Sequence, residues 1–383
     1  MRVASKTKVR TIPYALLAIA LISGLFSDGA TEDTMSIALR EFLETNIHLT
    51  NQEIQSVVAA RPLAKLLKTE TKEEIAIFGI VRIHVPQEYF IERLRNIIEF
   101  ESGSGVHSAG LFHTPPLLSD VATLQMDDED LKEIPKCKPG DCAIKLSDRA
   151  MQHLQKEIDW TSPQAKIQAQ SVIRKVFVDY VGAYQSIGDE ALSVYYDKDK
   201  PQAIREGLRN LLKHSTGFFQ YDPQLANYLE KYPNEKPPDT EDILYWQVVD
   251  FGLKPVVRAS HMVIHRSSNE NQVQYTIASK MLFASHYFRA ALELKSIVPN
   301  FRTDGGESIY LLCLNRSFVD GLTGLRGLLF GGTIRERSRE SVARYLTTAK
   351  QKLENSYRPR QFSSSGGKET SISLPDGWGA VRP

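Results

Sequence analysis

The sequence has few cysteines and lacks the short motifs that mark common enzyme and cofactor sites. Its 383 residues include three cysteines. It has neither the Gly-x-Ser-x-Gly elbow nor the Ser-x-x-Lys pair of hydrolases, and its glycine-spaced segment lacks the Gly-Lys-Ser/Thr of a phosphate-binding loop. No set of His, Cys, Asp or Glu has the spacing of a metal site. The sequence therefore predicts no cofactor and no metal, and an enzyme is the weaker interpretation.

An excess of either charge sign is also absent. The chain carries 47 Lys/Arg and 46 Asp/Glu, a formal net charge of +1. Residues 1–29 hold four of the basic residues and one of the acidic ones, so the remainder has 43 basic and 45 acidic residues and a balance of −2. A nearly neutral body has no electrostatic reason to bind nucleic acid, and none is expected as a partner.

Only one stretch of the sequence is apolar over a long run. It extends from Tyr14 to Phe26 after a basic start and is followed by the small residues Ser27 and Gly29. This pattern is typical of a secretory signal peptide, with cleavage after Gly29. The alternative is an uncleaved anchor, although a spanning helix needs about 20 apolar residues. We expect an exported protein, in the bacterial periplasm, without a stable membrane span once the signal is removed.

Two of the cysteines lie close together. Cys137 and Cys142 flank Pro139-Gly140-Asp141, a strong turn signal that brings the two thiols together. Export places them in an oxidising compartment, so we predict a short-loop disulfide. Their spacing is not the Cys-x-x-Cys of thiol oxidoreductases. Cys313 lies in an apolar run and is expected to be a buried free thiol.

The order of the predicted elements indicates an α+β fold, a curved antiparallel sheet packed on a long C-terminal helix with a helical insertion. The expected parts are an N-terminal α+β part over 34–146, the helical insertion over 147–235, the C-terminal sheet and long helix over 240–355, and a disordered tail over 356–383. Strands are expected in the C-terminal part at 243–249, 256–265, 273–288 and 309–315. The glycine-spaced segment 321–332 is predicted to be a loop, and the long helix to run over 334–353.

Two resemblances follow from these segments. The element order resembles START-like, helix-grip proteins, which implies an apolar ligand held between sheet and helix. Five segments resemble an uncharacterised family of exported bacterial proteins, which supports the envelope location and implies no known activity. These are 75–83 (Ile-Ala-Ile-Phe-Gly-Ile-Val-Arg-Ile), 137–142 (Cys-Lys-Pro-Gly-Asp-Cys), 251–257 (Phe-Gly-Leu-Lys-Pro-Val-Val), 284–288 (Ala-Ser-His-Tyr-Phe) and 314–320 (Leu-Asn-Arg-Ser-Phe-Val-Asp).

Polar residues interrupt the C-terminal strands and form the candidate binding site. His261 and His265 are four apart on a predicted strand, so with a period of two they face the same way. If neighbouring strands bring such residues together, they could fix the head group of a ligand; otherwise they line a solvated face or cap loops. The candidate ligand-binding residues are His261, His265, Lys280, His286, Asn315, Arg316 and Asp320.

Three functional hypotheses arise from these features. The first is non-enzymatic binding of a hydrophobic small molecule or lipid between the sheet and the terminal helix. The second is a hydrolase-type enzyme using His261, His286 and Asp320 as acid and base groups, which requires these side chains around one pocket. The third is an envelope interaction scaffold in which the helical insertion meets a protein partner.

Overall fold

A computed structural model describes residues 35–103, 105–220, 222–250, 254–269, 272–301 and 306–358. The predicted signal segment, 1–29, lies outside the described residues. Most of the predicted tail, from residue 359 onward, lies outside them as well.

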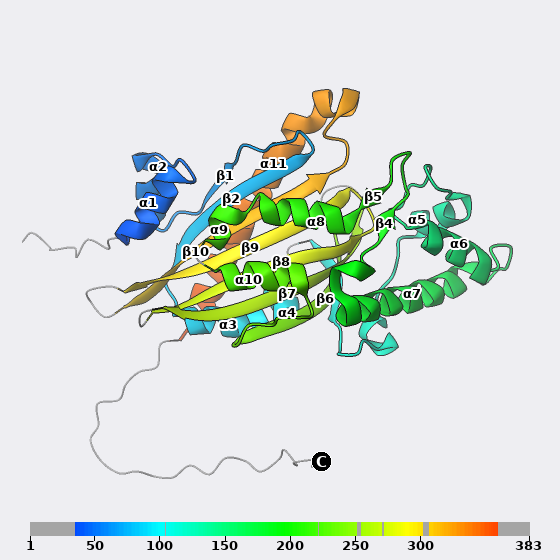
Figure 1. Cartoon of the computed structure of the whole chain (residues 1–383), viewed down its shortest axis with the longest axis horizontal. Coiled ribbons are helices and arrows are strands. Elements are labelled where there is room, and N and C mark those ends of the chain that lie inside the picture. Colours follow the sequence, from blue (N-terminus) through cyan, green and yellow to red (C-terminus); the bar gives the residue numbers. More distant parts are fainter. Residues whose placement is uncertain are drawn as a thin grey trace, which may run out of the picture.

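An antiparallel sheet of eight strands forms the centre of the described chain (Figure 1). Its order is β1-β2-β10-β9-β8-β7-β6-β3, and every neighbouring pair is antiparallel. The strands are β1 (Leu63–Leu66), β2 (Glu74–Ile83), β3 (Val106–Leu111), β6 (Thr240–Val249), β7 (Val256–Asn269), β8 (Gln272–Ala284), β9 (Phe288–Phe301) and β10 (Glu307–Val319). A small separate pair consists of β4 (Val194–Tyr195) and β5 (Gln202–Ala203).

Helices cover both faces of this sheet (Figure 1). One face carries α3 (Gln87–Arg95), α4 (Ile97–Phe100) and the long α11 (Gly324–Ser356). The other face carries α1 (Ile37–Thr45), α2 (Asn51–Val58), η1 (Leu118–Val121), α5 (Asp128–Glu133), η2 (Ile134–Lys136), α6 (Asp148–Glu157), α7 (Ala165–Ile187), η3 (Gly188–Ala191), α8 (Ile204–Lys213), α9 (Thr216–Phe219) and α10 (Pro223–Lys231). The predicted fold class is confirmed: α+β, with an antiparallel sheet packed on a long C-terminal helix. We call the two sides the α11 face and the helical-layer face.

Local sequence explains several of these boundaries. Thr50 caps α2 and forms a capping box with Glu53, since each side chain bonds the other residue's backbone N–H. Asp222 caps α10 by accepting a hydrogen bond from the Leu225 N–H, and Pro223 occupies the first helical position. Both helices therefore begin at residues whose side chains favour a helix start.

Period-two alternation along the strands divides the core into two clusters. On β10, Tyr310 and Leu312 face the helical layer, whereas Leu311 and Cys313 face α11. On the α11 side, the buried face of the long helix consists of Val342, Leu346, Ala349 and Leu353. Both faces of the sheet are therefore covered by side chains, as expected for a three-layer arrangement.

The long helix starts earlier than the glycine spacing predicted. The glycine spacing predicts a loop over 321–332, but α11 begins at Gly324, and the Gly327 N–H bonds the Thr323 carbonyl at 3.2 Å. Leucine and phenylalanine between the glycines have adequate helix propensity. The glycines therefore weaken the first turns of α11 without ending the helix.

One central strand was missing from the prediction. The expected strand over 273–288 ends at Ala284, the chain turns with Tyr287 at a φ of 60°, and β9 returns between β8 and β10. Polar residues such as Glu293 and Lys295 break the apolar pattern of β9. They pair with each other at 3.0 Å, with Lys295 buried, which is why the sequence pattern hid this strand.

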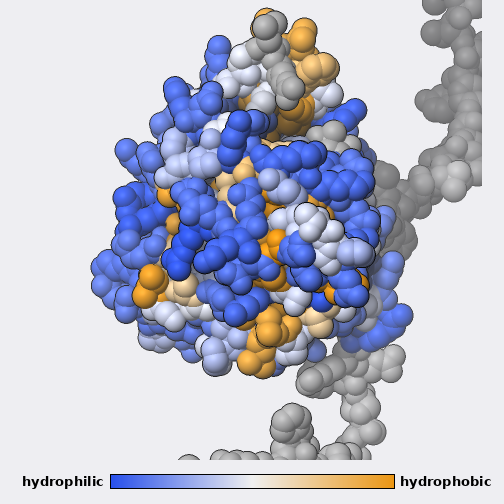
Figure 2. Space-filling model, turned by 90° about the vertical axis from the view of Figure 1, so that its right-hand side faces the viewer, coloured by the Kyte–Doolittle hydropathy of each residue, from blue (hydrophilic) through white to orange (hydrophobic). Residues whose placement is uncertain are grey.

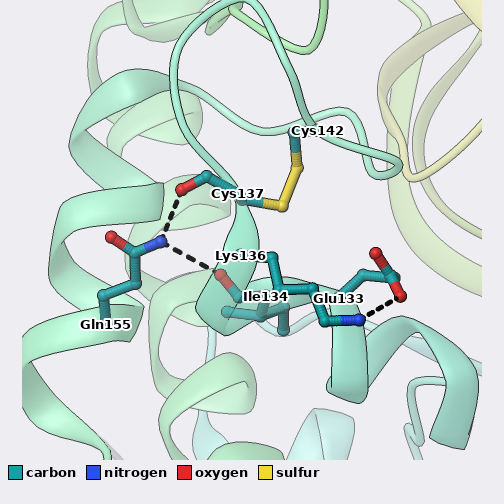
Figure 3. The surroundings of a disulfide bond; sticks show 6 residues. All are labelled: Glu133, Ile134, Lys136, Cys137, Cys142 and Gln155. Carbon is teal, nitrogen blue, oxygen red and sulfur yellow. Dashed lines mark hydrogen bonds and ion pairs between the residues drawn. A yellow bond between two sulfur atoms is a disulfide. The ribbon is translucent and has the colours of Figure 1, made fainter.

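The predicted disulfide is confirmed (Figure 3). Cys137 and Cys142 are joined across the turn, and Cys313 is a buried free thiol on β10. The Gln155 amide from α6 donates hydrogen bonds to the carbonyls of Ile134 and Cys137, at 3.1 and 2.6 Å. The bonded loop is therefore attached to the helical layer.

Candidate functional site

His261 lies at the centre of a buried hydrogen-bond chain on the helical-layer face. Its Nε2 lies 2.9 Å from an Asp242 carboxylate oxygen, and its Nδ1 lies 2.9 Å from the Tyr184 hydroxyl. With the carboxylate accepting from Nε2–H, the Tyr184 hydroxyl donates to Nδ1. Strands β6 and β7 and helix α7 thus each contribute one member of an Asp–His–Tyr chain.

Burial and charge set the protonation of this chain. Burial lowers the pKa of His261 despite the hydrogen bond to Asp242, which favours the neutral ring. Burial also opposes ionisation of Asp242, but the hydrogen bond from His261 and the ion pair with Lys236 outweigh it and lower the pKa of this carboxyl to about 2. The resting arrangement is therefore a carboxylate, a neutral imidazole and a neutral phenol.

Lys280 is the cross-strand neighbour of His261 and lies on the same face. Its ammonium bonds the Asp189 carboxylate and donates to the Leu229 carbonyl at 2.7 Å, and it lies 5.6 Å from the centre of the Tyr184 ring. The Lys280 side chain has no exposed surface, and burial lowers its pKa. Two of the predicted residues, His261 and Lys280, are therefore brought together by the sheet.

His265 and His286 occupy separate networks. His265 faces the same side as His261, as predicted, and its Nδ1 lies 2.8 Å from Asp222, the cap of α10. His286 lies beyond the end of β8 at Ala284, so the predicted strand over 273–288 does not reach it. It lies 2.7 Å from Asp130 on α5, which also accepts from Lys254 at 2.7 Å.

The three predicted residues from the end of the β10 region also diverge. Arg316 pairs with the buried Glu74 of β2, which also lies 2.9 Å from His214. Asp320 pairs with Lys145 and Lys198, each at 2.6 Å. Asn315 points to the opposite face of the sheet from Arg316, toward α11, beside its cross-strand neighbour Glu293. The seven predicted residues therefore belong to several networks on two faces of the sheet.

Sequence reasoning missed the partners that complete these networks. Asp242 lies one residue before a predicted strand, and it shares the face of Leu244 and Trp246 by period two, which could have placed it beside His261. Tyr184 continues the buried face of α7 with Phe177 and Val181. Neither pattern identifies the specific partner, because the pairing depends on how the helical layer lies on the sheet.

The amino-terminal end of α11 bears three large exposed apolar side chains. Leu328, Leu329 and Phe330 are 84%, 67% and 58% exposed. In Figure 1 this end of α11 extends beyond the sheet, and in Figure 2 hydrophobic residues gather at the corresponding top of the molecule. Three consecutive large apolar residues with this exposure are unusual on a surface that meets only water.

Searches for metal sites, membrane spans and relatives gave negative results. Within the described ranges, no group of three or more His, Cys, Asp or Glu could hold a metal ion. None of the helices in the described part of the chain combines the length and hydropathy needed to cross a membrane. A scan against protein-family models and a search of curated proteins found no match. The resemblances to helix-grip proteins and to exported bacterial proteins therefore stay predictions.

Proposed function

We propose that this chain is an exported, non-enzymatic envelope protein that contacts a lipid surface through the amino-terminal end of α11. The observation that carries the proposal is the exposure of Leu328, Leu329 and Phe330 at a projecting helix end. Burying a side chain of this size in an apolar phase contributes about 1.5–3 kcal/mol. Three together can hold the protein on a bilayer without a membrane span.

Charge near this end favours an anionic lipid surface. The Lys72 carbonyl accepts a hydrogen bond from Arg335 of α11, so the β1–β2 turn lies beside this helix. Lys72 and Arg337 are exposed, and neither side chain makes an ion pair in the described structure. Free cations close to an apolar helix end are the combination that anionic headgroups attract.

Two further features support surface binding over chemistry or a buried ligand. The acid and base groups His261, His286 and Asp320 each have a separate charged partner, whereas a hydrolase would need them around one pocket. The space between α11 and the sheet, where an apolar ligand was expected, contains the buried side chains of Val342, Leu346 and Leu353.

A fluorescent label placed at the helix end tests the proposal. Leu329→Cys would be labelled with an environment-sensitive dye and mixed with vesicles of phosphatidylcholine and phosphatidylglycerol. We expect a blue shift and a brighter emission, because the label enters the acyl region. The buried Cys313 thiol, 1% exposed, should not react with the dye.

The matched control is Leu118→Cys with the same dye, because Leu118 is also exposed, at 58%, but lies on η1. Its emission should not change. The readout is local, so it does not depend on whether residues 14–26 also enter the bilayer. An unchanged spectrum at position 329 with the protein bound to vesicles, or no binding at all, would refute the proposal.

A further inference from the structure

An open cleft of about 680 Å³ lies on the α11 face where β6 begins. Ile264 and Tyr275 form its floor and are 1% and 7% exposed. Three cations from three separate elements line its sides: Arg95 at the end of α3, Lys236 in the loop before β6, and Arg266 on β7. The carboxylates of Asp239 and Glu241 line the cleft as well, so it combines a partly aromatic base with three cations and two carboxylates.

The three cations differ in how firmly they are paired. Arg95 makes two hydrogen bonds to Glu241, at 2.6 and 2.8 Å, and Lys236 lies 2.7 Å from Asp242. Arg266 lies 3.7 Å from Asp239, which is beyond hydrogen-bond distance. Both side chains are exposed, at 43% and 65%, so this pair contributes little. The guanidinium of Arg266 is therefore available to another acceptor.

The loop that forms one wall of the cleft has an unusual backbone. Glu235 and Asp239 adopt left-handed conformations, with φ of 57° and 51°. Such conformations are uncommon for residues other than glycine and occur more often at binding sites. Between them, Lys236 reaches Asp242, the outermost member of the buried Asp–His–Tyr chain. This backbone holds Lys236 and Asp239 at the edge of the cleft.

We infer that this cleft binds a small organic anion whose carboxylate or phosphate is attached to an apolar ring. The planar guanidinium of Arg266 would hold the anion through paired hydrogen bonds, displacing the weakly bound Asp239. The ring would lie against the accessible lining residues Pro237 and Pro238 and the edge of Tyr275, and Arg95 would stay paired with Glu241. The cleft is distant in the fold from the amino-terminal end of α11, and its binding of an anion does not depend on lipid binding.

Calorimetric titration of the full chain with phenyl phosphate tests the inference. Inorganic phosphate at matched ionic strength is the parallel probe, because it offers the anion without the ring. We expect phenyl phosphate to bind more tightly by about fivefold or more, because the ring covers apolar surface. Arg266→Gln should raise the Kd for phenyl phosphate about tenfold.

Two further variants keep the result interpretable. Arg266→Lys retains the charge without the planar guanidinium. Its Kd for phenyl phosphate should therefore lie between those of the unchanged chain and of Arg266→Gln. Arg205→Gln is the matched control, because Arg205 is an equally exposed arginine, 40%, whose partner Glu190 is on the other face. Its Kd should equal that of the unchanged chain. Equal affinity for the two phosphates, unchanged affinity in Arg266→Gln, or no binding of phenyl phosphate would overturn the inference.

Discussion

The buried ammonium group of Lys280 depends on its partners. Its side chain is fully buried, the Asp189 carboxylate balances its charge, and the Leu229 carbonyl accepts a hydrogen bond from it. Removing one partner of a buried ion pair typically costs about 3–5 kcal/mol, because the other charge stays buried and unpaired. We therefore expect Lys280→Met to lower the free energy of unfolding by that amount, measured by urea denaturation.

The surface pair Lys231–Glu235 provides the control. Its side chains are 49% and 54% exposed, so Lys231→Met should change the free energy of unfolding by less than about 1 kcal/mol. The double variant Lys280→Met/Asp189→Asn should recover part of the loss, because it leaves no unpaired charge. Equal effects of the two lysine variants would show that Lys280 is not held as a buried ion.

At the residue scale, the sequence indicated which side chains share a face but not which ones touch. Period two correctly placed His261 and His265 on one side of β7. The partners Tyr184 and Asp222 come from helices distant in the sequence, and no local pattern encodes such a contact. The same limit applies to His286, whose position after the end of β8 depends on an unforeseen turn.

At the element scale, the contact between α11 and β2 depends on the small size of Gly79. A methyl group at this position would lie 2.9 Å from both Val342 and Leu346, which is closer than carbon atoms pack. We expect Gly79→Ala to lower the free energy of unfolding by about 1–3 kcal/mol, since overpacked cores must shift side chains or backbone. Thermal and urea unfolding would measure this loss.

Two variants of α11 complete this test. Leu346→Ala makes room for the new methyl group, so the double variant should lose less stability than the sum of the single variants. Gly332→Ala is the control within the same helix, because nothing lies within 4 Å of its added carbon; alanine should stabilise the helix there by about 0.5–1 kcal/mol. Strict additivity of Gly79→Ala and Leu346→Ala would contradict the proposed contact.

Elements with a regular apolar period were predictable, and those with an interrupted period were not. The helices of 147–235 and strands β6 and β7 followed from their apolar patterns. Strand β9 did not, because the Glu293–Lys295 pair places charge in a buried strand. The first turns of α11 were also missed, since glycine is common in loops and only tertiary context extends the helix through it.

At the scale of the whole molecule, the two faces of the sheet are held by different interactions. Apolar side chains dominate the contact with α11, whereas several buried hydrogen-bonded pairs of polar side chains join the helical layer to the sheet. The pairs that cross this boundary include His261–Asp242 with Tyr184, His265–Asp222, His286–Asp130, Arg316–Glu74 with His214, and Lys280–Asp189. Carboxylates appear in every one, so acid should weaken the helical-layer side more than the α11 side.

Asp242 gives this acid sensitivity a defined pH range. Its pKa is about 2 in the folded chain, below its ordinary value of 3.8, so its stabilisation is fully present above about pH 4–5 and is lost as the pH falls toward 2. A shift of this size corresponds to about 2 kcal/mol. Between pH 6 and pH 3 the loss should be on the order of 1 kcal/mol, measured by urea unfolding. Asp242→Asn should be less stable at pH 6 and should lack this part of the pH dependence.

The same acid sensitivity predicts the order in which the helices lose protection. Hydrogen exchange at pH 3 should increase in α7 and α10 before it increases in α11. Simultaneous loss of protection in all three helices would show that the two faces unfold together, and that the buried carboxylate pairs do not set the order.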